Sequence, residues 1–185
     1  LAEFTLSRKD PAYVGLAKEI HKAQEALMDG KDPVTVKPEL AEIMDEIHVQ
    51  FPQAANDNIG FGSTIFAVKP GDGSAREQAA SCQKVLGGWA NIANEYATKR
   101  YRSNLINWGM LPFVIPDGDL PFTNHDYLFF PGIRKAVEEK AAEITGYVVD
   151  ANGLKPFTVT LGELTDEERQ IILKGCLINY NRVEK

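Results

Sequence analysis

A predicted strand, a glycine-rich turn and a helix start follow one another between residues 64 and 80, and together they could bind an anion. Apolar residues open the stretch, and Gly71 and Gly73 break the strand because glycine adopts backbone angles that other residues resist. Ser74 then stands where a helix N-cap is expected. A helix start carries unpaired N–H groups and a partial positive charge, and Arg76 adds a guanidinium that can hold a carboxylate at two points. The stretch therefore predicts an anion site without specifying the anion.

Each of these residues also has a purely structural interpretation. Ser74 could serve only as an N-cap, which is worth about 1 kcal/mol to a helix. Arg76 would be unfavourably placed near the positive end of the helix dipole unless it contacts an anion, so an anion contact explains it better. Glu77 would compensate the dipole or pair with a neighbour. The basic residues 99, 100 and 102 could line a substrate entrance or form a solvated helix face.

No metal site is predicted from the cysteines or histidines. Cys82 and Cys176 do not form a Cys-x-x-Cys pair and are expected to be packing residues, as free cysteines often are. His21 and His48 lack a second histidine or cysteine at ligand spacing, so surface or packing roles are expected. His125 has no visible partner in the sequence and receives no role.

Composition limits the class of protein. The 185 residues are 44% hydrophobic, which is enough for one good core, and two cysteines favour a reducing cytoplasm over a disulfide scaffold. A net charge of −6 argues against nucleic acid or a membrane surface as partner, and no apolar run is long enough to span a bilayer. The chain does not begin with Met, which suggests a piece of a longer protein.

Two helices are predicted before the glycine-rich stretch. One starts at Asp10-Pro11 and ends at Gly30, and the other runs from Pro38 to just before Phe51-Pro52. We therefore expect residues 1–55 to form a helical segment or connector, and residues 56–185 to form the main domain. The segment 53–62, with Asn-Asp-Asn at 56–58, is predicted to be a loop.

Strands and helices alternate in the rest of the chain, which predicts an α/β domain with a parallel or mixed sheet. Strands are expected at 64–68, 89–93 and 110–115, with helices at 75–86, 96–108 and 133–144. The runs 147–149 and 157–160 flank Asp-Ala-Asn-Gly and predict a β-hairpin. A capping box at 165–168 opens the last predicted helix, which ends at Gly175.

Several of these motifs resemble the swivel domain of the aconitase and isopropylmalate isomerase family. Gly-Asp-Gly-Ser-Ala-Arg-Glu-Gln-Ala-Ala at 71–80 resembles the family signature Gly-x-Gly-Ser-Ser-Arg-Glu-His/Gln-Ala-Ala. Asn-Leu-Ile-Asn-Trp-Gly-Met-Leu-Pro-Phe at 104–113 resembles its Asn-Leu-x-x-x-Gly-Leu-Leu-Pro-Leu segment. The C-terminal run 168–179 is similar to the family's last helix and Gly-Ser-x-x-Asn tail. The resemblance extends from about residue 63 to the end.

The resemblance implies a three-layer β/β/α swivelling domain of a hydro-lyase that acts on a di- or tricarboxylic hydroxy acid. A [4Fe–4S] cluster, held by cysteines of other domains of the same enzyme, would bind and polarise the substrate, and this chain would bind no metal. Ser74 would be the catalytic base, while Arg76, Ala75 and Gly73 would bind the substrate carboxylate. The chain would be one domain, inactive alone, with the cluster-bearing domains and a small carboxylate substrate as its partners.

Two departures from the family pattern are visible. Ala75 replaces the second serine of the signature, and Pro70 stands where tyrosine is usual before the first glycine. They indicate a divergent hydratase rather than a standard aconitase. The alternative is a non-catalytic module that keeps the swivel fold and binds an anion or a partner domain.

Overall fold

Helices and strands alternate through most of the chain in a computed structural model that describes residues 2–8, 10–55 and 58–182. The helices are α1 (Ala2–Ser7), α2 (Pro11–Met28), the 3₁₀ helix η1 (Pro33–Thr35), α3 (Leu40–Gln50), α4 (Arg76–Val85), α5 (Lys99–Asn107), α6 (Ile133–Glu138), α7 (Asp166–Leu173) and α8 (Leu177–Tyr180). The strands are β1 (Ser63–Ala67), β2 (Gly88–Ala93), β3 (Leu111–Val114), β4 (Tyr127–Phe129), β5 (Ile144–Asp150) and β6 (Gly153–Val159). Residues 56 and 57 of the predicted 53–62 loop lie outside the described residues.

The strands form two three-stranded sheets. One is parallel with the order β1-β2-β3, and the other is antiparallel with the order β4-β5-β6. An isolated antiparallel bridge between Val114 and Thr160 joins them through backbone hydrogen bonds of 2.7 and 2.9 Å. The predicted α/β fold with parallel and antiparallel pairing is confirmed, and the two kinds of pairing are divided between separate sheets.

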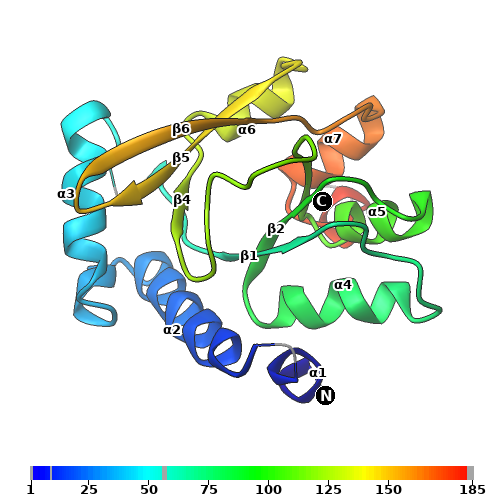
Figure 1. Cartoon of the computed structure of the whole chain (residues 1–185), viewed down its shortest axis with the longest axis horizontal. Helices are drawn as coiled ribbons and strands as arrows, with labels where there is room; N and C mark the ends of the chain where they lie inside the picture. Colours follow the sequence, from blue (N-terminus) through cyan, green and yellow to red (C-terminus); the bar gives the residue numbers. More distant parts are fainter. Residues whose placement is uncertain (1, 9, 56–57, 183–185) are drawn as a thin grey trace.

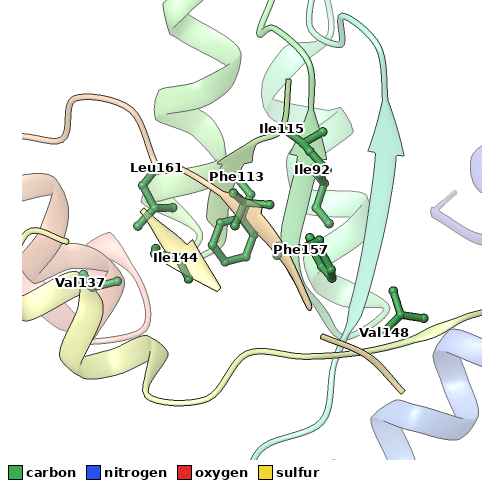
Figure 2. Close-up of a cluster of buried hydrophobic side chains, with 10 residues drawn as sticks. Ile92, Phe113, Ile115, Val137, Ile144, Val148, Phe157 and Leu161 are labelled. Carbon is green, nitrogen blue, oxygen red and sulfur yellow. The ribbon is translucent and has the colours of Figure 1, made fainter. Parts of the chain in front are cut away.

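The main core lies between the two sheets. Ile92 and Phe113 of the parallel sheet pack against Ile144, Val148 and Phe157 of the antiparallel sheet (Figure 2). Parallel strands are usually covered on both faces, and the residues of β2 are buried except for one at position 89.

Helices α4 and α5 cover the other face of the parallel sheet, so the order of layers is antiparallel sheet, parallel sheet, helices (Figure 1). Ala80 of α4 and Leu105 of α5 are fully buried there, in one cluster with Met110. This arrangement confirms the predicted three-layer β/β/α fold.

The two N-terminal helices form where the sequence predicts them and pack on the body of the molecule. Met44 and Ile47 of α3 share an apolar cluster with Val149 of β5. Helix α2 reaches the start of β1, where the Tyr13 hydroxyl lies 3.0 Å from that of Ser63. The division at 55/56 into a helical segment and a main domain stays a prediction.

Three predicted boundaries are corrected. The helix expected over 133–144 ends at Glu138, because Lys140 adopts a positive φ of 56° and the backbone N–H of Ala141 turns back to the carbonyl of Ala136. Ile144 opens β5 instead, where it is buried and pairs with Val159. The helix expected from 96 starts at Lys99, and the chain continues beyond α7 into the short helix α8. Strand β4 and the opening helix α1 were not predicted.

No helix in the described ranges has the length and apolar character needed to cross a membrane.

Candidate functional site

The glycine-rich turn after β1 is fixed to the turn after β2, at the carboxyl edge of the parallel sheet. The backbone N–H of Ala97 donates to the carbonyl of Pro70 at 2.9 Å, and the Thr98 hydroxyl donates to the carbonyl of Gly71 at 3.0 Å. Gly71 has a φ of +99°, and a Cβ placed on it would lie 2.4 Å from Cβ of Tyr101. The first glycine therefore lets the turn lie directly against α5.

Helix α4 begins at Arg76 and its N-cap is Ala75, so the prediction that Ser74 is the N-cap is wrong. The backbone N–H of Ala79 donates to the carbonyl of Ala75 at 3.0 Å, which places Ser74 one residue outside the helix. Within the described chain no side chain caps this helix start. The N–H groups of its first turn are the ones that a helix cannot satisfy by itself, so they remain available to an acceptor.

The residues just before α4 face solvent. Gly73, Ser74 and Ala75 are exposed, and a Cβ built on Gly73 would meet no atom within 4 Å. An acceptor could therefore approach the helix start from the side of this turn without displacing protein atoms.

Arg76 is half-buried, and its Nε atom is buried without a hydrogen-bond partner in the described structure. An unsatisfied buried donor costs free energy, roughly 1–3 kcal/mol and more for a charged group. The neighbouring carboxylate of Glu77 accepts instead from Nε1 of Trp108 at 3.0 Å. Of the two predicted roles for Glu77, pairing with a neighbour is therefore observed.

The basic residues that open α5 differ from one another. Lys99 and Arg100 are exposed, as expected for a solvated helix face. Arg102 was predicted either to line a substrate entrance or to lie on a solvated helix face, and it does neither. Its guanidinium donates to the backbone carbonyls of Leu161 at 3.3 Å and Glu163 at 2.5 Å. It holds α5 against the segment that leads into α7 rather than lining an entrance.

A buried polar network connects α4, β2 and α5 beneath the turn. The Tyr101 hydroxyl donates to Oδ1 of Asn91 at 2.8 Å and accepts from Nε2 of Gln83 at 3.0 Å, while the Asn91 amide donates to Gln83. Burial raises the pKa of Tyr101, which stays a neutral donor. The network fixes both helices on the sheet. Sequence reasoning did not find it, because its members are 10 and 8 residues from Asn91 and follow no motif.

A shallow groove lies beside the same helix start. It has a volume of about 230 Å³ and is lined by Glu77, Asn104, Asn107, Trp108, Cys176 and Leu177. The groove thus brings together the first turn of α4, the last turn of α5 and the start of α8.

In the described ranges, the histidines and cysteines do not gather with acidic residues into a group that could hold a metal ion. His125 pairs with Asp10 at 2.8 Å and holds the pKa of that carboxyl below its usual range, which gives it the partner that the sequence did not reveal. No group of three His, Cys, Asp or Glu residues in the part of the chain that the structure describes could hold a metal ion. An iron–sulfur cluster needs several thiolates, and one buried and one half-buried cysteine do not fit such a cluster.

Comparison with known proteins finds one family model that matches part of the chain, including this site. Residues 44–118 match the family model described as the aconitase C-terminal domain. Among solved structures, a 3-isopropylmalate dehydratase from Methanocaldococcus jannaschii is 24% identical, with a TM-score of 0.38, and the match covers 73% of each chain. A likeness at that score supports no inference about the substrate. No curated protein matches the chain.

Proposed function

We propose that the chain is the swivel domain of a hydro-lyase, a proposal supported by the match of residues 44–118 to the family model described as the aconitase C-terminal domain. Its substrate would be a di- or tricarboxylic hydroxy acid. The rest of the active site, including the cysteines that hold a [4Fe–4S] cluster, would lie on other domains of the complete enzyme or on a partner subunit. Two free cysteines suit a reducing cytoplasm.

One observation supports this function most directly, namely the uncapped start of α4 beside the Arg76 guanidinium, whose buried Nε has no hydrogen-bond partner among the described residues. The first-turn N–H groups and Arg76 offer converging donors to a substrate carboxylate, and Gly73 and Ala75 leave the approach open. Arg76 can hold a carboxylate at two points, which fixes its orientation as well as its position.

Ser74 would then remove the proton next to that carboxylate. The Ser74 alkoxide takes the proton from the substrate carbon and becomes a hydroxyl, the electron pair of that C–H bond forms the new double bond, and the C–O bond of the neighbouring carbon breaks. The departing hydroxide would be received and protonated on the part of the active site that lies on the other domains. The alkoxide is scarce at neutral pH because the pKa of a serine hydroxyl lies far above 7. The helix start and Arg76 both favour a negative oxygen at this position, and closure of another domain over the exposed turn would exclude water.

A non-catalytic anion-binding module is the second candidate, and Ala75 favours it. The signature's second serine would supply a hydroxyl to the substrate, and alanine supplies none. Both candidates use the same anion site and differ only in the role of Ser74.

Substitution of Ser74 separates the two candidates in the complete enzyme. Ser74→Ala should lower turnover by orders of magnitude and leave the melting temperature unchanged, because Ser74 is exposed and does not cap α4. Unchanged turnover would eliminate the catalytic role and leave the binding module.

Substitution of Arg76 tests the anion site itself. Arg76→Lys should raise the Michaelis constant, because an ammonium cannot reproduce a two-point contact with a carboxylate. Arg100→Lys is the matched control, since Arg100 is exposed on the neighbouring helix. Equal effects of the two substitutions would argue against a specific site at Arg76.

A further inference from the structure

The hydrogen bond between Trp108 and Glu77 ties the first turn of α4 to the end of α5. Nε1 of Trp108 donates to Oε1 of Glu77 at 3.0 Å, and both residues line the groove beside the helix start. Glu77 directly follows Arg76, so its carboxylate is an acid in the immediate neighbourhood of the proposed anion site.

The position of Trp108 is fixed by packing of its ring and by a close backbone contact of the residue that follows it. Its ring packs against the buried cluster that contains Ala80 and Met110. The next residue, Gly109, has a φ of +74°, and a Cβ on it would lie 1.8 Å from the carbonyl oxygen of Gly175. The backbone after Trp108 therefore lies directly against the segment between α7 and α8, and the indole N–H has a fixed direction.

A free carboxylate at position 77 would compete with a bound anion in two ways. It could pair with the guanidinium of Arg76, or it could repel an anion at the helix start. Neither position is taken by Glu77, whose carboxylate is engaged by the indole, and within the described residues the Nε of Arg76 has no partner. Adjacent residues of a helix point about 100° apart, so holding Glu77 toward α5 also separates it from Arg76.

We propose that Trp108 is a positioning residue for the anion site: it retains the Glu77 carboxylate on the α5 side and so leaves Arg76 available to a carboxylate ligand. This inference rests on the proposed function, because it assumes that Arg76 binds an anion. Beyond the proposed function, the inference states that the Glu77 carboxylate must be held away from Arg76, and that the indole N–H of Trp108 holds it there.

The test is a titration of the full ¹⁵N-labelled chain with citrate, followed by NMR at the Nε–Hε signal of Arg76 and the amides of residues 76–78. Trp108→Phe keeps an aromatic ring but removes the N–H, and should weaken citrate binding by about five- to tenfold, as expected for one released charge near a partly exposed site. Glu77→Asp should weaken it similarly, because the shorter carboxylate cannot reach the indole and the core is left intact. Trp89→Phe is the control, since Trp89 lies at the amino end of β2, away from the candidate site at the carboxyl end of the strands. Its ring packs on Gly60 and Gly62.

The double variant Trp108→Phe with Glu77→Gln distinguishes positioning from a general structural effect. Glutamine at position 77 carries no charge, so its side chain should not compete with the anion when the indole no longer holds it. Citrate affinity should therefore return to within about twofold of the wild type. Weak binding in the double variant, or wild-type binding in Trp108→Phe, would overturn the inference while the proposed function stands. If citrate leaves the Arg76 signals of the wild type unmoved, the anion site itself is refuted, and the inference with it.

Discussion

Replacement by alanine should affect two glycines of the same turn differently: at one it should lower stability, and at the other it should weaken ligand binding. Gly71 and Gly73 are separated by one residue and belong to the same signature. Gly71 has a φ of +99° and contacts Tyr101, whereas Gly73 has no left-handed φ and open space around it. We therefore expect Gly71 to be needed for folding and Gly73 for ligand approach.

The structure sets the size of the effect at Gly71. A residue with a Cβ at this φ costs of order 1–3 kcal/mol in backbone strain. The added methyl group would also lie 2.4 Å from Cβ of Tyr101, which is 3% exposed and held by its hydroxyl network, so overpacking adds about 1–3 kcal/mol. Together they predict a loss of about 2–6 kcal/mol, or roughly 5–20 °C in melting temperature for a chain of this size. Gly73→Ala should stay within about 0.5 kcal/mol of the wild type.

Thermal melting and citrate titration of the two variants test this reasoning together. Gly71→Ala should melt early, while Gly73→Ala should melt with the wild type yet bind citrate more weakly, because its methyl group enters the path of the ligand. A stable Gly71→Ala variant would refute the close approach of the turn to α5. Wild-type citrate binding by Gly73→Ala would show that the anion does not approach past this glycine.

Three further predictions concern the parts of the fold that support the site. Tyr101→Phe should lower the free energy of unfolding by about 1–3 kcal/mol, measured by urea denaturation, because Asn91 loses a buried donor. Met44→Ala should lower the free energy of unfolding by about 2–4 kcal/mol in the same assay. A single unfolding transition should be preserved, because α3 packs on the β5–β6 hairpin and should unfold with it. Two transitions would indicate a separate N-terminal unit. The pKa of Asp10 is lowered by its hydrogen bond with His125, so its contribution to stability is present above about pH 4 and is lost as the pH falls through the lowered pKa. The difference in melting temperature between Asp10→Asn and the wild type should therefore shrink below that pH; a constant difference would assign the effect to the N-cap bond alone.

Elements with local signals in the sequence were predicted well. Asp10 before a proline marks the start of α2, and its side chain does accept from the N–H of Ala12. The capping box at Thr165 forms as expected, with Glu168 as the reciprocal partner. These signals depend on residues within four positions of one another, so they do not require knowledge of the tertiary structure.

Features that depend on distant contacts were not predicted. The helical pattern after Ile133 continues to Ile144, but pairing with β6 takes Ile144 into the sheet. Ser74 has the best side chain for an N-cap, yet the turn is fixed to α5 through the carbonyl of Gly71, and the helix begins one residue later than the side-chain preferences suggest. In both places, tertiary contacts outweigh local propensity, which is worth a kcal/mol or less per residue.

The later helix start changes what the candidate site can do. A serine that caps its own helix would occupy one of the first-turn N–H groups and hold its hydroxyl against the backbone. With Ala75 as the N-cap, those N–H groups stay open and the Ser74 hydroxyl is exposed. Two nearby cations are otherwise engaged, since Lys69 pairs with Glu95 at 2.9 Å and Arg102 binds backbone carbonyls. Among the residues that the structure describes, the buried Nε of Arg76 has no partner, an arrangement that costs the isolated chain free energy and that a bound carboxylate would relieve. Such a local cost at an open helix start is easier to explain by ligand binding than by folding, because a cap at position 75 and an acid facing Arg76 would both have made the chain more stable.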